Sequence, residues 1–179
     1  VAKNGGLFST SDAGASWQAL GKPFPEDDAA FRPVYMKDTQ GIALRFNGLE
    51  GTVACVGIAG EKAQVRIRTT GDGGKTWITQ NRESAGNLFG IGFSSPNRGA
   101  AVGTQGRIFR TDNGGKVWKQ AVNNQVRKKT LLKVSFFDQD RGICVGLNGA
   151  ILSTSDGGAS WNPLPGLKYY NWFSGISLL

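Results

Sequence analysis

Carboxylate and hydroxyl side chains recur at one fixed spacing in this chain of 179 residues. The pattern Thr-x-Asp-x-Gly-x-x-Trp, called the box below, occurs four times, with Asn replacing Asp in the third copy. The four boxes contain Thr10, Asp12, Gly14 and Trp17; Thr70, Asp72, Gly74 and Trp77; Thr111, Asn113, Gly115 and Trp118; and Thr154, Asp156, Gly158 and Trp161. A carboxylate beside a hydroxyl could bind a metal, act as a general acid or base, or hold a tight turn together.

The repetition favours the structural role of the boxes. A catalytic site needs one unique group of residues, whereas the box is repeated in nearly identical form. Thr and Asp oxygens two residues apart can accept hydrogen bonds from nearby backbone N–H groups, and Gly tolerates a left-handed backbone. The Trp supplies a large, flat apolar side chain that can pack beneath the turn. Since Asn113 can accept hydrogen bonds as Asp does, we expect turn geometry rather than charge, catalysis or metal binding to explain the pattern.

The residue types outside the boxes also argue against several kinds of catalysis. The chain has no His, which removes His-based acid–base catalysis, Ser-His-Asp triads and His metal sites. Cys55 and Cys144 cannot form a zinc site alone, and we expect both to be buried apolar residues. A glycosidase needs two carboxylates about 5–10 Å apart, but Asp138 and Asp140 fit a turn beside Arg141 better. We therefore predict no enzymatic activity and no cofactor, with glycoside hydrolysis as the alternative.

Basic side chains are the better candidates for binding. The net charge of +8 favours an acidic protein face, nucleic acid or lipid headgroups as a partner. Arg is well suited to carboxylate and phosphate recognition, and solvated strand faces are the alternative explanation. The candidate partner-binding residues are Arg66, Arg68, Arg107 and Arg110, on or near expected third strands, and the cluster Arg127, Lys128 and Lys129. Nucleic acid has only the charge in its support, so we expect a protein partner with an acidic face.

The spacing of the boxes indicates which elements position these residues. The last three box tryptophans lie 41 and 43 residues apart, and the first interval is 60 residues. A period near 40 residues indicates a repeat architecture. Within each period, alternating apolar segments at residues 42–46, 89–93 and 132–136 predict strands. Turn pairs between apolar runs predict hairpins at Asn4-Gly5, Gln105-Gly106 and Asn148-Gly149.

The repeat unit is thus four antiparallel strands, with the box between the third and the fourth. Such a sheet, repeated at this period, is the blade of a β-propeller. We predict an all-β propeller of four-stranded antiparallel blades, with about four blades present, as a single domain over residues 1–179. Extra residues at 58–64 are expected to form a connecting loop. The expected parts are a partial blade at 1–20, blades at 34–82, 87–122 and 130–164, and a terminal first strand at 172–179.

The box segments resemble Asp-box, or bacterial neuraminidase, repeats. A longer pattern places Arg98-Gly99 before Val102-Gly103 and Arg141-Gly142 before Val145-Gly146, each followed by a strand and a box. This pattern is similar to the photosystem II stability and assembly factor family. The resemblance implies a seven-bladed propeller in the thylakoid lumen, a non-enzymatic chaperone that binds the reaction-centre core through an arginine-rich surface. Similar boxes in sialidases and xyloglucan-active glucanases imply a carbohydrate-active or carbohydrate-binding propeller as the alternative.

The length of the chain leaves three arrangements open. The sequence contains three whole blades, a first blade without its first strand, and a terminal segment at 173–179 that has the pattern of a first strand. Pairing of that segment with the strand that begins at Val1 would close a ring of four blades. Otherwise the chain is a piece of a larger propeller, or two chains associate to complete one ring. We expect any targeting segment to have been removed or to lie outside this sequence, and the resemblance implies the thylakoid lumen, the periplasm or secretion as the location.

Overall fold

The computed structural model describes residues 7–21, 32–33, 42–47, 50–59, 62–83, 88–122, 128–164 and 176. Strands and turns make up this part of the chain, and its one helical element is η1 (Thr104–Gly106), a short 3-10 turn. No helix among these residues is long and apolar enough to cross a membrane. The predicted all-β class is therefore confirmed.

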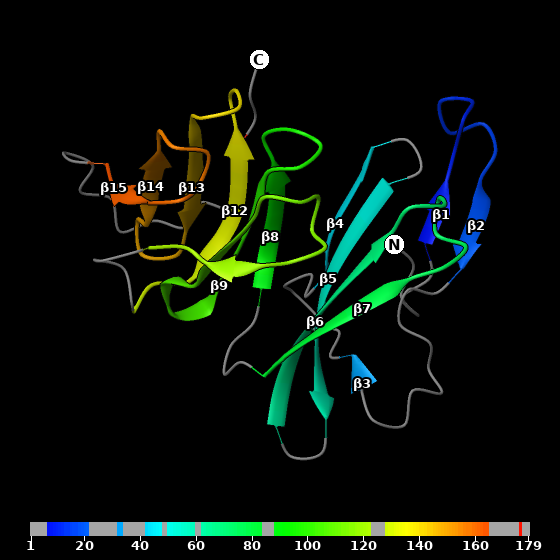
Figure 1. The fold of residues 1–179 in the computed structure, drawn as a ribbon, viewed down its shortest axis with the longest axis horizontal. Coiled ribbons are helices and arrows are strands. Elements are labelled where there is room, and N and C mark those ends of the chain that lie inside the picture. Colours follow the sequence, from blue (N-terminus) through cyan, green and yellow to red (C-terminus); the bar gives the residue numbers. More distant parts are fainter. Residues whose placement is uncertain are drawn as a thin grey trace.

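Two four-stranded antiparallel sheets form the third and fourth blades (Figure 1). The third blade consists, in order, of β8 (Leu88–Phe93), β9 (Gly99–Gly103), β10 (Ile108–Thr111) and β11 (Lys119–Gln120). The fourth blade consists of β12 (Leu131–Phe136), β13 (Gly142–Gly146), β14 (Ile151–Thr154) and β15 (Asn162–Pro163). Each strand pairs with the next one along the chain, as in the blades that the repeat predicts.

The second blade corrects one expectation of the sequence. It contains β4 (Ile42–Asn47), β5 (Glu50–Ala59), β6 (Lys62–Thr70) and β7 (Ile78–Glu83), with the short β3 (Arg32–Pro33) beside the far end of β5. The extra residues near 58–64 form no long loop. They lengthen β5 and β6, which stay paired up to Ala59 opposite Lys62, because ladder hydrogen bonds satisfy their backbone polar groups. The lengthened hairpin extends beyond the other blades (Figure 1).

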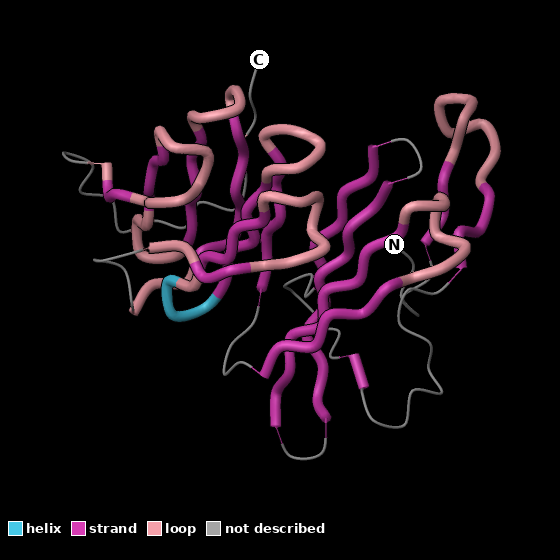
Figure 2. The backbone as a smooth tube through the Cα atoms, in the orientation of Figure 1, coloured by secondary structure: helices cyan, strands magenta, loops and turns pink. Residues whose placement is uncertain are grey.

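The first blade is described only as a hairpin of β1 (Leu7–Ser9) and β2 (Gln18–Gly21) around the first box. This hairpin and the fourth blade lie at opposite ends of the molecule (Figure 2), and the sheets do not close into a ring. The expected strand at Val1, the Asn4-Gly5 turn and the terminal strand, apart from Ile176, lie outside the described residues.

Neighbouring blades meet through their first strands, since β8 lies against both β4 and β12. Glycine permits the close approach of β8 to β12. A Cβ atom at Gly90 would lie 2.8 Å from the carbonyl oxygen of Leu132, and one at Gly92 would lie 2.8 Å from that of Val134. Gly and larger apolar residues therefore alternate along β8 because the strand contacts two blades. The glycines face the fourth blade, and the larger apolar residues face the second.

Two apolar clusters fill the spaces between blades. The cluster between the third and fourth blades includes Ala100, Val102, Ile108, Leu131, Cys144, Leu152 and Trp161. The cluster between the second and third blades includes Ile67, Leu88, Ala101, Phe109 and Trp118. In both clusters the box Trp packs against the blade that precedes its own. The core of the described residues thus lies between the blades, and the third and fourth boxes each supply one of its largest side chains, Trp118 and Trp161.

Candidate functional site: the box rim and the hairpin rim

The fourth box is a closed network of hydrogen bonds. Thr154 Oγ1 donates to Asp156 Oδ1 at 2.8 Å and accepts from the backbone N–H of Gly158 at 2.9 Å. Asp156 Oδ1 also accepts from the Ser160 N–H at 2.9 Å, and Oδ2 accepts from the Ser160 hydroxyl at 2.5 Å. Trp161 Nε1 donates to the Gly158 carbonyl at 3.2 Å. The carboxylate is therefore engaged inside its own turn.

The first two boxes repeat this network and keep their carboxylates ionised. Hydrogen bonds from Ser16 and Thr10 hold the pKa of Asp12 well below its usual range, and bonds from Thr76 and Thr70 do so for Asp72. Burial raises the pKa of Asp156, but the hydrogen bonds of its box outweigh burial and lower it. A carboxyl group with a lowered pKa is a poor general acid at neutral pH.

The third box shows two complementary substitutions. Asn113 Oδ1 accepts from Thr111 Oγ1 at 3.1 Å and from the Val117 N–H at 2.8 Å, as the Asp oxygen does elsewhere. Position 117 carries Val where the other boxes carry Ser or Thr, so no hydroxyl is present to donate to a second carboxylate oxygen. Trp118 is fully buried here, and its Nε1 makes no hydrogen bond.

The boxes and the turns between first and second strands share one edge of the blades, which we call the box rim. Gly114 N–H donates to the Asn97 carbonyl at 2.8 Å, and Gly157 N–H donates to the Asp140 carbonyl at 2.9 Å. A salt bridge of 3.7 Å between Arg98 Nη1 and Asp140 Oδ1 joins the turns of the third and fourth blades. These contacts tie the third and fourth boxes to their own blades and join those two blades to each other.

The remaining carboxylates of the box rim are also paired with arginines. Asp138 Oδ1 accepts from the Arg141 N–H at 2.7 Å, and its Oδ2 lies 2.7 Å from Arg141 Nε. These hydrogen bonds lower the pKa of Asp138 to about 2. Arg110 Nη1 lies 3.2 Å from Asp112 Oδ1. The acidic groups described on this rim therefore serve turns and ion pairs, as predicted for Asp138 beside Arg141, whereas the ion pair of Arg98 with Asp140 was not predicted.

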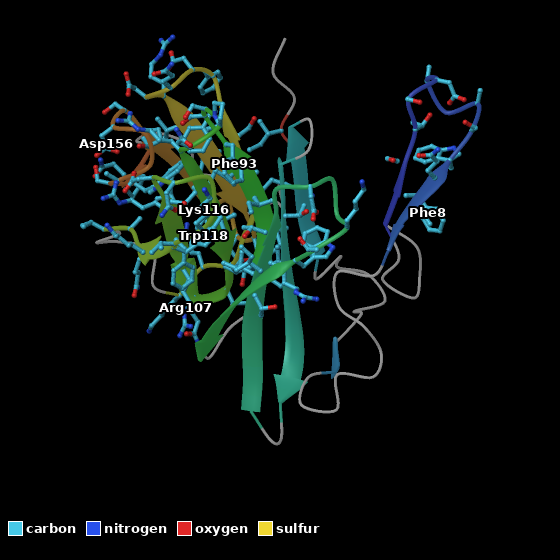
Figure 3. The ribbon with its side chains drawn as sticks, turned by 45° about the vertical axis from the view of Figure 1, so that its right-hand side comes forward. Phe8, Phe93, Arg107, Lys116, Trp118 and Asp156 are labelled. Atoms are coloured by element: carbon cyan, nitrogen blue, oxygen red, sulfur yellow. The ribbon has the colours of Figure 1, made fainter. Side chains whose placement is uncertain are left out.

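The opposite edge, which we call the hairpin rim, carries the turns between second and third strands. The φ angles are 58° and 64° at Gln105 and Gly106, and 55° and 64° at Asn148 and Gly149. Positive φ at both central residues is what a type I′ hairpin turn requires. Figure 3 shows Arg107, beside the first of these turns, and Asp156 of the fourth box at opposite edges of the blades.

Three of the candidate basic residues meet on the hairpin rim, and we call them the basic cluster: Arg107, Lys128 and Lys129. The Gly106 N–H donates to the Lys129 carbonyl at 2.6 Å, which brings the turn of the third blade to the start of the fourth. Arg107 Nη2 donates to Gln105 Oε1 at 3.2 Å, and Lys129 Nζ donates to the Asn148 carbonyl at 3.3 Å. Both acceptors are neutral, and Lys128 is exposed.

The other predicted residues are distributed differently. Arg110 belongs to the box rim, through its salt bridge, and not to the basic cluster. Arg66 and Arg68 lie two positions apart on β6. Arg127 lies outside the described residues, as do Tyr169, Tyr170 and Trp172. Cys144 is fully buried, and burial raises the pKa of its thiol.

Stacked four-stranded meanders with box turns define this protein as a β-propeller, present as an open set of blades. It is similar to a structure of YCF48 bound to a D1 peptide, with 22% identity, a TM-score of 0.56, and coverage of 77% of this chain and 44% of that one. YCF48 from Cyanidioschyzon merolae gives 22% identity, a TM-score of 0.53, and coverage of 75% and 42%.

Glycoside hydrolases of family GH74 are similar to a comparable degree. The GH74 enzyme of Niastella koreensis shares 15% identity, with a TM-score of 0.57 over 90% of this chain and 27% of the enzyme. This chain spans less than half the length of each of these proteins. No protein-family model and no curated protein sequence matches the chain. At such identities the likeness establishes the propeller fold.

Proposed function

We propose that this chain is a non-enzymatic, protein-binding propeller that holds an acidic segment of a partner against its hairpin rim. The basic cluster carries the proposal, because a hydrogen bond between two blades places Arg107 beside Lys129 and the adjacent Lys128. Lys129 Nζ donates to a neutral carbonyl, that of Asn148, and Lys128 is exposed on the same rim. An acidic partner would gain both attraction and orientation from such a surface.

The similarity to YCF48, a photosystem II assembly factor, suggests the kind of partner. One of those structures holds a D1 peptide. We therefore propose that the chain acts as a chaperone in photosystem II assembly, binds a segment of a membrane-protein intermediate, and works in the thylakoid lumen. The periplasm or the extracellular space is the alternative location. Arg66, Arg68 and Arg127 are further proposed partner-binding residues.

Binding of a fluorescent D1 peptide, measured by anisotropy at about 0.1 M and about 1 M salt, tests this proposal. The screening length falls from about 10 Å to about 3 Å over this range, so an electrostatic complex should weaken strongly. The triple variant Arg107→Gln, Lys128→Gln and Lys129→Gln should bind about tenfold more weakly or worse. Absence of binding to the unmodified chain at low salt would refute the proposed partner.

A matched control removes three charges from the other rim. The triple variant Arg98→Gln, Arg110→Gln and Arg141→Gln has the same net charge as the first variant, and exposed ion pairs contribute little to stability. It should bind the peptide nearly as well as the unmodified chain. Equal losses in both variants would mean that overall charge, rather than the basic cluster, governs binding.

A carbohydrate-active propeller is the second candidate. It is favoured because the similarity to the GH74 enzyme extends over 90% of this chain. Hydrolysis by the usual route needs a general acid and a second carboxylate across the sugar. Asp138 and Asp140 are instead held by Arg141 and Arg98. Incubation with xyloglucan, with reducing ends measured over time, discriminates the two functions. Release of sugar in proportion to protein would establish the enzyme and overturn the non-enzymatic proposal.

A further inference from the structure

The fourth box makes two side-chain hydrogen bonds beyond the set that all four boxes share. The Ser160 hydroxyl donates to Asp156 Oδ2 at 2.5 Å. Trp161 Nε1 donates to the Gly158 carbonyl at 3.2 Å, although Trp161 is only 2% exposed. The first bond fastens the carboxylate across its turn, and the second gives the buried indole N–H an acceptor.

The third box has neither of these two bonds. Val117 stands at the position of Ser160 and has no hydroxyl, and the neutral Asn113 replaces the carboxylate. Hydrogen bonds to a charged acceptor are roughly twice as strong as those between neutral groups, and the bond from Thr111 Oγ1 to Asn113 Oδ1 is 3.1 Å long, against 2.8 Å for the matching bond in the fourth box. Within the described residues, Trp118 Nε1 has no hydrogen-bond partner, although Trp118 is 0% exposed.

A second buried polar atom lies on the second blade, against which Trp118 packs. Ile67 of β6 belongs to the same buried cluster as Trp118. Thr69 follows two positions later, on the same side of this strand, and is 5% exposed. Its Oγ1 has no hydrogen-bond partner in the described part of the chain. The closed third box therefore buries an indole N–H and a hydroxyl at one interface, and access of water to that interface would satisfy both groups.

We propose that the third box is a conformational device, a turn that opens by itself while the blades on either side stay folded. Opening breaks fewer and weaker bonds than in the fourth box, and it lets water bind Trp118 Nε1 and Thr69 Oγ1. The fourth box lacks this gain, because Trp161 Nε1 already has an acceptor. Elements that move when a protein binds a ligand are drawn from such regions of low local stability. The proposal does not depend on the basic cluster or on the proposed partner.

Amide hydrogen exchange of the full chain, followed by NMR, tests this proposal. The Gly115 N–H donates to Thr111 Oγ1 at 2.9 Å. The Gly158 N–H makes the matching bond to Thr154 Oγ1, also at 2.9 Å, and both bonds are buried. Each of these glycines follows another glycine, so their exchange rates without protection are similar. The Gly115 N–H should exchange at least about tenfold faster than the Gly158 N–H, and equal rates would overturn the proposal.

A restored box separates local opening from the stability of the whole fold. The double variant Asn113→Asp and Val117→Ser gives the third box the carboxylate and the hydroxyl of the fourth. It should slow exchange at Gly115 at least about tenfold and leave exchange at Gly158 unchanged. Equal slowing at both glycines would show that the variant stabilises the whole fold, and no slowing at Gly115 would show that the missing bonds do not govern opening. Either result would contradict a turn that opens by itself.

Thr69→Val tests the part that water plays in opening. This variant removes the buried hydroxyl and keeps the shape of the side chain, so the closed box has one unsatisfied group fewer and exchange at Gly115 should become slower. The control Thr69→Ser keeps the hydroxyl and should give no slowing. Exchange at Gly115 that is unchanged or faster in Thr69→Val would show that the hydroxyl is satisfied in the closed box, which would overturn the proposed gain on opening. Circular dichroism verifies that each variant keeps its strands.

Discussion

At the scale of single residues, the hydroxyl of the box Thr makes two hydrogen bonds that hold the turn together. Thr154 Oγ1 serves both as donor to Asp156 and as acceptor for a buried Gly158 N–H, and the residue is only 5% exposed. Thr154→Ala leaves that N–H buried without an acceptor, which should lower the free energy of unfolding by about 1–3 kcal/mol. Urea denaturation measures the loss.

The first box supplies the comparison for this substitution. Thr10 makes the same bond to the backbone of Gly14, at 2.8 Å, but it is exposed. Water can replace the hydroxyl there, so Thr10→Ala should cost less than about 0.5 kcal/mol. A similar loss at both positions would show that burial is not what makes the box Thr important.

A second residue-scale prediction concerns Ala13. Its φ is 55°, while the equivalent residues Gly73, Gly114 and Gly157 have φ of 73°, 70° and 70°. The left-handed region is unfavourable for Ala, so Ala13→Gly should stabilise the first hairpin by about 0.5–1 kcal/mol after the entropy of Gly is included. Slower hydrogen exchange at the Gly14 N–H measures this. Gly157→Ala should instead destabilise, since its Cβ would also lie 3.2 Å from the Gln139 carbonyl.

At the scale of elements, the packing of first strands depends on glycine. Gly92→Ala would place a Cβ atom 2.8 Å from the Val134 carbonyl, a backbone atom that can move only if β12 moves. The expected cost is about 1–3 kcal/mol, as for other overpacked sites. Gly71→Ala is the matched control, because nothing lies within 4 Å of its Cβ position. Thermal unfolding of both variants and of the unmodified chain measures this cost. An unchanged unfolding temperature for Gly92→Ala would contradict this account.

At the scale of the whole molecule, the ionised boxes make stability depend on acid pH. The pKa values of Asp12, Asp72 and Asp156 are lowered, and that of Asp138 falls to about 2. A carboxyl group whose pKa is lowered by folding stabilises the fold above its unfolded pKa of about 3.9, and this stabilisation is lost as the pH falls through the folded pKa. We expect the urea midpoint to be level from pH 7 to about 5 and to fall between about pH 4 and 2.

A variant can test this linkage directly. Asp156→Asn with Ser160→Val copies the third box, where Asn113 and Val117 make the same turn without a carboxylate. One titrating group is then removed, so the fall in midpoint between about pH 4 and 2 should become shallower. An unchanged slope would mean that the box carboxylates contribute nothing to acid stability.

Several features of the whole molecule could be read from the sequence because they depend on short-range bonds. The Gln105-Gly106 and Asn148-Gly149 turns need positive φ, which the residue types already indicate. The strands and their order follow from periods of two and of about 40 residues, and the structure confirms them as propeller blades. The partner-binding role of the basic residues stays a prediction.

Long-range relations were decided by the tertiary structure. Trp17 and Trp161 make the same local bond to a box carbonyl, yet Trp17 is exposed and Trp161 is buried, because the third blade packs against Trp161. Likewise Arg107 and Lys129 are 22 positions apart and meet through a backbone bond between blades, while Arg110 pairs with its neighbour Asp112. Turns and strand periods are properties of a few consecutive residues, so the sequence determined the blades and their boxes. Burial and surface charge depend on which blades stand side by side, and only the packed sheets decide that.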